Sequence, residues 1–278
     1  MLKLAMVNDR ITPLESLDPI YFDRGIYFGD GVYEVLRSYN GKIFALEEHL
    51  QRFATSLAAI RINSVDLGHV RDRVERAFTT AGLSNARIYF HVTRGSAPRN
   101  HVWEADLEPN FFLTVGDAPD STEEKAKGIT VSTHPDWRWK RCDIKSLNLL
   151  ANVLARQDAV DKGCEEAILV DEAGCITEGS GSAFFAIIGR TLQTAPLTAN
   201  ILPSITRQYV LKAASNIGLA IKEDCLTPPQ AAAADEMFIA VTTKDIVPVV
   251  RFDSTVIGAG SPGPHTKALM TEFRKFTV

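Results

Sequence analysis

Residues 141–170 read RCDIKSLNLLANVLARQDAVDKGCEEAILV, and this stretch decides the fold. Its first part repeats apolar residues at helical spacing, and it contains Ser146, a residue type that begins helices, and Gly163, a type that follows their ends. The apolar run AILV that follows predicts a buried strand. One face of the expected helix is apolar and consists of Leu147, Leu150, Ala151, Leu154, Ala155 and Ala159.

Short strands and turns continue on both sides of this stretch. GITVSTH, which precedes it, predicts a strand. AILVDEAGCITEG predicts a hairpin that turns at 172–174, and SAFFAIIGRTLQTA predicts a second one that turns at 189–190. We then expect a helix over 204–217 with Gly218 at its end, and a closing strand from Met237.

The amino-terminal part also mixes strands with helices. The expected elements are a hairpin over 2–14 turning at Asn8-Asp9, a strand over 32–39 turning at Asn40-Gly41, helices over 46–60 and 67–81, and strands from Arg87 and Phe111. A polar, acidic, proline-containing stretch follows, and its composition is typical of a connector. The sequence therefore predicts a mixed α/β (α+β) fold with an N-terminal domain over 1–117, a linker over 118–125 and a C-terminal domain over 126–278.

Composition narrows the class of protein. The 278 residues are 45% hydrophobic and 23% charged, which is typical of a globular chain, and the net charge of −4 gives no reason to expect a nucleic-acid partner. The longest apolar run, 183–189, is far shorter than the roughly 20 residues of a membrane span, and the first residues do not resemble a signal peptide. Four widely spaced cysteines form neither a CxxC pair nor a zinc pattern. We expect a cytoplasmic protein that acts on small molecules.

Two side chains are candidates for chemistry. Lys145 has apolar neighbours, so it either lies over apolar surface as a structural lysine or supplies the neutral amine that imine formation requires. Glu178 precedes the small, hydroxyl-rich turn Gly179–Ser182 and is either a loop carboxylate or a partner for a protonated ring nitrogen. The helix start at 203–206 offers free amides to an anion. Thr242 and Thr243, at the end of a predicted strand, are possible further hydroxyl ligands.

Taken in order, six blocks resemble the fold-type IV pyridoxal-phosphate enzymes, and most of all the D-amino-acid aminotransferases. These blocks span nearly the whole chain, so the resemblance is not local. They are YFDRGIYFGDGVYEV, EEHLQRF, RIYFHVTRGSAPRNH, RCDIKSLNLLANVLARQDAVDKGCEEAIL, TEGSGSAFF and ILPSITR.

The resemblance implies a cofactor, pyridoxal 5'-phosphate, and assigns residues to it. Lys145 is then the catalytic Schiff-base lysine that also moves a proton, and Glu178 pairs with the pyridine nitrogen. The remaining cofactor-binding residues, mostly on the phosphate, are implied to be Arg52, Ser180, Ile205, Thr206 and Thr242. No metal is expected, because the six histidines form no HxxxH pair.

The resemblance also implies the substrates. Tyr33 would face the substrate, while Arg99 and His101, in the segment RNH, would bind its carboxylate from the partner subunit of a homodimer. The expected reaction moves the amino group of D-alanine or a similar D-amino acid to a 2-oxo acid such as 2-oxoglutarate, with ping-pong kinetics.

Three positions depart from the D-alanine aminotransferase pattern. Gly181 replaces a serine of the EGSSSN block, Ser204 replaces a glycine before Ile-Thr, and Val241 replaces a serine that often precedes the Thr-Thr pair. These departures bear on cofactor affinity and on the wall of the substrate pocket.

Other functions stay open at this point. A branched-chain L-aminotransferase, an R-selective amine transaminase or an aminodeoxychorismate lyase would keep Lys145 and Glu178. A nucleic-acid-binding protein could use the aromatic and basic segment 137–141 instead. A serine hydrolase is not supported, because GSGSA does not fit the GxSxG pattern.

Overall fold

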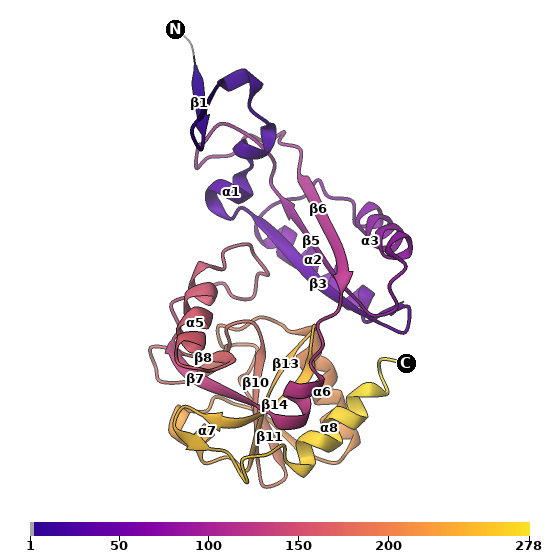
Figure 1. Ribbon diagram of the computed structural model, residues 1–278, viewed down its shortest axis with the longest axis vertical. Helices are drawn as coiled ribbons and strands as arrows, with labels where there is room; N and C mark the ends of the chain where they lie inside the picture. Colours follow the sequence, from indigo (N-terminus) through magenta and orange to yellow (C-terminus); the bar gives the residue numbers. More distant parts are fainter. Residues whose placement is uncertain (1–2) are drawn as a thin grey trace.

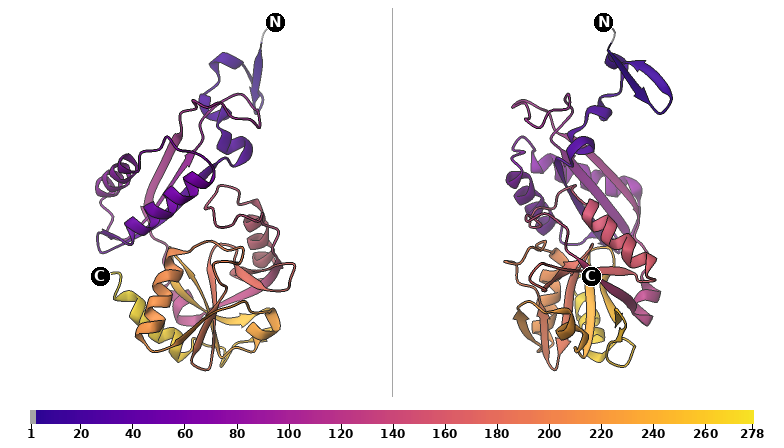
Figure 2. Two further views of the ribbon diagram at one scale, coloured as in Figure 1. Left: turned by 180° about the vertical axis from the view of Figure 1, so that it is seen from behind. Right: turned by 90° about the vertical axis from the view of Figure 1, so that its left-hand side faces the viewer.

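Two lobes with separate sheets make up the computed structural model, which describes residues 3–278 (Figure 1). The smaller lobe holds the amino-terminal strands, and the larger lobe holds the strands from residue 129 onward. Figure 2 shows the lobes stacked along the long axis, with the N-terminal hairpin at the end farthest from the larger lobe. The predicted mixed α/β fold is confirmed, while the predicted domain division at 118–125 stays a prediction.

The smaller lobe is an antiparallel sheet covered by helices on one face. Its strand order is β4-β3-β5-β6, and the sheet packs its apolar side chains against α2 and α3 around the buried Phe53 and Phe90. The predicted hairpin, turn and helices of this region are confirmed, although Leu2 lies outside the described residues. The elements are β1 (Leu4–Val7), β2 (Arg10–Pro13), α1 (Arg24–Phe28), β3 (Gly31–Tyr39), β4 (Lys42–Ile43), α2 (Leu46–Ala59), α3 (Leu67–Ala81), β5 (Ala86–Thr93) and β6 (Asn110–Asp117), with short 3-10 helices at Leu14–Ser16 and Pro19–Phe22.

The larger lobe is a mixed, curled sheet of order β12-β11-β10-β13-β14-β7-β8-β9, with β15 beside β14. Apolar side chains fill both of its faces, one of them under α6 and α8. The two predicted hairpins and the predicted helix over 204–217 are confirmed. The elements are β7 (Ile129–Pro135), α5 (Leu150–Asp161), β8 (Glu166–Val170), β9 (Ile176–Gly179), β10 (Ala183–Ile188), β11 (Thr191–Thr194), α6 (Ile205–Asn216), β12 (Ala220–Glu223), α7 (Pro228–Ala232), β13 (Glu236–Val241), β14 (Asp245–Phe252), β15 (Thr255–Val256) and α8 (Pro264–Arg274).

The start of α5 differs from the prediction. The helix begins at Leu150 rather than after Ser146, because the backbone before it pairs with β3. The predicted apolar face is only partly buried: Ala155 and Ala159 pack against the sheet, whereas Leu150 and Leu154 are 72% and 48% exposed. Apolar periodicity finds the apolar face of a helix but not the surface that covers it.

Two regions contain structure that the sequence analysis does not predict. Part of the expected connector forms α4 (Thr122–Lys127), and Met237 does not begin the last strand, since β14, β15 and α8 follow it. Across residues 3–278 we find no helix that is both long and apolar enough to cross a membrane.

Candidate active site

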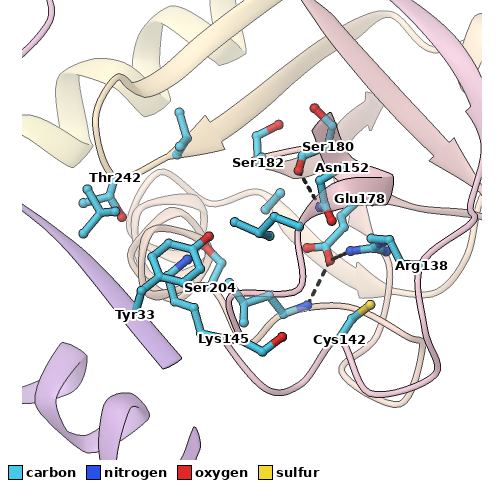
Figure 3. Close-up of a pocket in the computed structure, with 18 of the residues that line it drawn as sticks. Tyr33, Arg138, Cys142, Lys145, Asn152, Glu178, Ser180, Ser182, Ser204 and Thr242 are labelled. Atoms are coloured by element: carbon cyan, nitrogen blue, oxygen red, sulfur yellow. Dashed lines mark hydrogen bonds and ion pairs between the residues drawn. The ribbon is translucent and has the colours of Figure 1, made fainter. Parts of the chain in front are cut away.

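A cavity of about 280 Å³ lies between the two lobes. Tyr33 and Arg52 line it from the smaller lobe, and Glu178 and Thr242 line it from the larger one. Figure 3 shows Lys145 reaching into the same space beneath Tyr33. Six of the ten predicted site residues, Tyr33, Arg52, Lys145, Glu178, Ser180 and Thr242, thus line one cavity, although they are far apart in sequence.

Lys145 is carried on an extended segment that is hydrogen-bonded to the smaller lobe. Its carbonyl accepts from the Tyr33 N–H at 3.0 Å, and its own N–H donates to the Ser56 hydroxyl at 3.1 Å. The Leu147 N–H donates to the Gly31 carbonyl at 3.0 Å. The amine lies 4.1 Å from the centre of the Tyr33 ring. The side chain therefore enters the cavity from a backbone that is fixed on both sides.

Glu178 lies in β9 at the opposite wall and is buried. Its Oε1 atom accepts from Arg138 and from the Leu202 N–H, the latter at 3.1 Å (Figure 3). Burial raises the pKa of Glu178; Arg138 and the Leu202 N–H only partly offset this, and the nearby Asp136 charge raises the pKa further. The Arg138 guanidinium also binds Asp136, at 2.7 Å. Both bonds to Glu178 end on Oε1, so Oε2 remains for a donor in the cavity.

Arg52 approaches the cavity from α2 and is held by a second buried carboxylate. Two of its nitrogens donate to Glu34 at 2.7 Å, and a third donates to the Pro203 carbonyl at 3.0 Å. His49 lies 2.7 Å from the same carboxylate. Burial alone would raise the pKa of Glu34, but the Arg52 charge and the hydrogen bonds from His49 and Arg52 outweigh it and lower the pKa to about 2. A charged guanidinium is thus fixed beside the start of α6.

The start of α6 faces the same end of the cavity. Ser204 caps the helix by accepting from the Arg207 N–H at 3.2 Å, and it lines the cavity with Thr242. Ile205 and Thr206 are buried in the first turn, where the Thr206 hydroxyl lies 3.4 Å from that of Thr242. A helix N-terminus, a fixed arginine and two hydroxyls form a site suited to an anion such as a phosphate.

The turn after Glu178 is fixed by a third buried carboxylate. The hydroxyls of Ser180 and Ser182 both donate to Glu166, the second at 2.9 Å, and Asn152 donates to the Ser180 carbonyl at 2.7 Å. A side chain at Gly181 would meet no atom within 4 Å. The Ser180 hydroxyl is therefore used within the turn, and the departure at Gly181 leaves open space rather than a close contact.

Arg99 and His101 lie elsewhere. Both side chains are exposed on the loop between β5 and β6, and neither belongs to the part of the described chain that lines the Lys145 cavity. The prediction that they act from a second copy of the chain is compatible with this placement and is not tested by it.

A comparison with known protein families decides the classification. The model of the amino-transferase class IV family matches residues 31–252. The chain belongs to that family. Class IV aminotransferases are pyridoxal-phosphate-dependent, so the predicted cofactor class is confirmed.

Relatives and solved structures resemble this class IV aminotransferase over nearly its whole length. The D-alanine aminotransferase of Bacillus licheniformis is 40% identical over 250 residues, covering 90% of this chain and 88% of the relative. The D-alanine aminotransferase of Staphylococcus aureus strain N315 is 37% identical over 284 residues, covering 99% and 98%. A branched-chain amino acid aminotransferase structure from Escherichia coli has a TM-score of 0.87 at 25% identity, covering 96% and 92%.

The residues of this class IV aminotransferase fit pyridoxal phosphate on structural grounds. The anion site at α6 suits the phosphate, and Glu178 offers Oε2 at the opposite wall for a protonated ring nitrogen. Lys145 enters between them, where an amine can reach an aldehyde carbon. One cavity thus has a matching group for each functional end of the cofactor.

Several residues of the class IV aminotransferase site were missed from sequence. Arg138 was grouped with the aromatic and basic segment 137–141, but its side chain is only 7% exposed and binds Asp136 and Glu178. Arg138 is therefore not part of an exposed basic surface, although Trp137, Trp139, Lys140 and Arg141 are exposed. Asn152, Glu166 and Glu34 were also missed. Asn152 and Glu34 are each a lone polar residue within an apolar pattern, whereas Glu166 follows Glu165 and has no such signal.

Proposed function

We propose that this class IV aminotransferase transfers the amino group of D-alanine, or of a similar D-amino acid, to a 2-oxo acid such as 2-oxoglutarate. The observation that carries the proposal is full-length similarity to D-alanine aminotransferases, at 34–40% identity for those most similar to this chain. The branched-chain enzymes resemble this chain in structure at 25% identity or less, so a branched-chain activity is less well supported.

Each end of the cavity has a proposed task. Pyridoxal phosphate, when bound, supplies an electron sink and a carrier for the amino group. Lys145 holds the cofactor and moves a proton at the substrate α-carbon, because one flexible amine can reach both sites of proton exchange. Glu178 keeps the ring nitrogen protonated, since a buried carboxylate is stabilised by a cation beside it.

The other end of the cavity holds the cofactor in place. Arg52, Thr242 and the first turn of α6, with Ile205 and Thr206, are proposed to bind the phosphate. Ser180 contributes through its turn, because its hydroxyl donates to Glu166. Tyr33 packs against the Lys145 amine and limits the space open to the substrate. These contacts fix one face of the substrate toward Lys145, which stereospecific proton transfer requires.

A second copy of the chain is proposed to complete the site. Arg99 and His101 would bind the substrate carboxylate from that copy through charge-assisted hydrogen bonds. The exposed apolar side chains Leu150, Val153 and Leu154 on α5, at 72%, 59% and 48%, support a homodimer because monomeric proteins seldom expose such a cluster. The cell compartment is proposed to be the cytoplasm, where the four free cysteines would stay reduced.

The decisive experiment follows the visible spectrum of the purified, cofactor-loaded protein. D-alanine should convert the bound pyridoxal form to the pyridoxamine form, while L-alanine, L-leucine and (R)-1-phenylethylamine should not. Preference for L-leucine or the amine would establish one of the rival transaminases. Release of pyruvate from aminodeoxychorismate without an amino acceptor would establish the lyase instead.

A variant pair tests the role of the lysine. Lys145→Ala should lose the visible absorbance of the enzyme-bound cofactor and nearly all turnover. Lys140→Ala, which removes an exposed lysine outside the cavity, should keep both. Normal turnover in the Lys145→Ala protein would reject the proposed mechanism.

A further inference from the structure

A buried arginine, Arg24, is hydrogen-bonded to the main chain of the loop that carries Arg99 and His101. The loop joins β5 to β6, and its side chains from residue 98 to 106 are exposed. Arg24, in α1, is only 3% exposed. Its Nη1 donates to the Asn100 carbonyl at 2.5 Å and its Nη2 to the His101 carbonyl at 3.1 Å. One planar guanidinium therefore fixes two consecutive carbonyls of an otherwise exposed loop.

Side chains of the same loop rest on α1 as well. The Arg99 guanidinium lies 5.3 Å from the centre of the Phe28 ring, and the His101 ring lies 5.4 Å from it. The Arg24 guanidinium is 4.9 Å from that ring. Because Arg24 and Phe28 are one turn apart on α1, a single helix holds both the backbone and the two functional side chains of the loop.

The helix that does this is itself firmly attached. Asp23 caps it by accepting from the Gly25 N–H at 2.6 Å, and it also accepts from Thr93 at 2.7 Å and Asn110 at 2.6 Å. Thr93 ends β5 and Asn110 begins β6, so α1 is tied to both ends of the loop. Small displacements of the loop relative to the sheet are therefore opposed at three points.

A partly buried acid, Asp30, completes the support. Asp30 accepts from the Arg24 Nε at 2.8 Å and from two nitrogens of Arg94 at 2.8 and 3.0 Å. Arg94 in turn donates to the carbonyls of Ile60 and Arg61. Asp30 thus sets the plane of the Arg24 guanidinium, and it would keep a cationic partner if Arg24 were replaced.

We propose that Arg24 is a positioning residue that sets the geometry in which Arg99 and His101 bind the substrate carboxylate. This rests on the proposed function, in which those two residues bind that group. A forked arginine contact requires its guanidinium to match the plane of the carboxylate, so small displacements of the loop weaken it strongly. Arg24 acts through the loop and does not need to touch the substrate.

Two variants of the holoenzyme test the proposal. Arg24→Met removes the three donors but keeps the length of the side chain and leaves Asp30 paired with Arg94. Phe28→Leu keeps apolar volume but removes the ring. In single-turnover reactions, each variant should raise the D-alanine concentration that gives half of the maximal rate. For Arg24→Met we expect a rise of about tenfold or more, because hydrogen bonds from a charged donor are lost. The limiting rate should change by less than about threefold, since only ground-state carboxylate binding is weakened.

A second measurement separates positioning from general damage. Hydroxylamine reacts with the bound cofactor and carries no carboxylate, so its rate should be the same in Arg24→Met and the parent protein. Arg24→Lys, which keeps the charge but cannot reach both carbonyls in a fork, should fall between the parent and Arg24→Met. Arg71→Met, which removes a surface arginine paired with Glu47 and Glu75, is the matched control and should leave every value unchanged.

The outcomes distinguish this proposal from the proposed function. Arg99→Leu should weaken D-alanine binding at least as much as Arg24→Met. If Arg99→Leu weakens it and Arg24→Met and Phe28→Leu do not, the positioning role is wrong and the function stands. If Arg99→Leu has no effect, the carboxylate assignment fails. Equal losses toward D-alanine and hydroxylamine in Arg24→Met would also overturn the proposal; should that variant not fold, Arg24→Lys and Phe28→Leu decide by the same comparison.

Discussion

Glu34 and Glu178 are both buried beside an arginine, and the structure holds their carboxylates in opposite ways. Glu34 accepts two bonds from Arg52 and lies against His49, and its pKa falls to about 2. Glu178 shares its arginine with Asp136, and burial raises its pKa. At Glu34 the charges and hydrogen bonds of Arg52 and His49 outweigh burial, whereas at Glu178 burial and the Asp136 charge outweigh Arg138.

The comparison separates a structural carboxylate from a functional one. Glu34 is fully satisfied by protein groups, and its effect is to fix Arg52 beside the start of α6. Glu178 has one cationic protein partner, Arg138, which it shares with Asp136. A protonated ring nitrogen in the cavity would supply a further positive charge beside Glu178. This accounts for a buried carboxylate at that wall, because burying a carboxylate costs free energy unless a cation pairs with it.

The largest expected effect is on turnover. Glu178→Gln removes the charge that favours a protonated ring but keeps the shape and one acceptor. We expect kcat to fall by about 100- to 1000-fold, because an electrostatic contact at the reacting group is lost. Steady-state kinetics with D-alanine and 2-oxoglutarate measure this. A fall of less than about threefold would mean that Glu178 is no more functional than Glu34.

The second prediction concerns stability. The folded-state pKa of Glu34 is lowered from 4.5 to about 2, so its charge stabilises the fold above pH 4.5, and this contribution disappears as the pH falls from about 4.5 toward 2. Glu34→Gln should lower the free energy of unfolding by about 3 kcal/mol at pH 7. Urea unfolding at several pH values measures it, and the difference should shrink on acidification. Glu47→Gln, which changes an exposed partner of Arg71, is the control.

The third prediction concerns Arg138, the arginine that Glu178 shares with Asp136. The Arg138 charge lowers the pKa of Glu178 against the effect of burial, so Arg138→Met should let that pKa rise further. More of Glu178 is then protonated at neutral pH and does not stabilise a cation. We expect activity at pH 7 to fall about tenfold and to recover partly as the pH rises. A pH–rate profile parallel to that of the parent protein would contradict the proposed effect of Arg138 on the pKa of Glu178.

The smallest effect is expected in the turn that follows Glu178. Gly181→Ser adds a side chain where no atom lies within 4 Å, so the free energy of unfolding should change by less than about 0.5 kcal/mol. The added hydroxyl should leave cofactor affinity equal or higher, as measured by cofactor titration of the apoenzyme. A marked loss of affinity would show that the turn is as tightly constrained as the surroundings of Glu34.

The sequence predicted the residues proposed to contact the cofactor, and it missed the residues that hold those side chains in place. Lys145 and Glu178 were found because their motifs resemble a family, and α6 was found because Ser204 and Gly218 mark its ends. Arg138 and Glu166 act through contacts between segments distant in sequence, which no local pattern encodes. The apolar face of α5 was only partly correct for a related reason, since Ala155 and Ala159 are buried in the lobe while Leu150 and Leu154 are exposed on it.

The pairing of the Lys145 segment with β3 has a consequence for how the molecule could be divided. Lys145 belongs by sequence to the second half of the chain, but its main chain is bonded to Tyr33 of the first half, and that of Leu147 to Gly31. Polypeptides 1–117 and 118–278 produced separately would each lack part of the cofactor cradle. Enzymatic activity regained on mixing them would therefore report their association at that junction rather than the folding of either fragment.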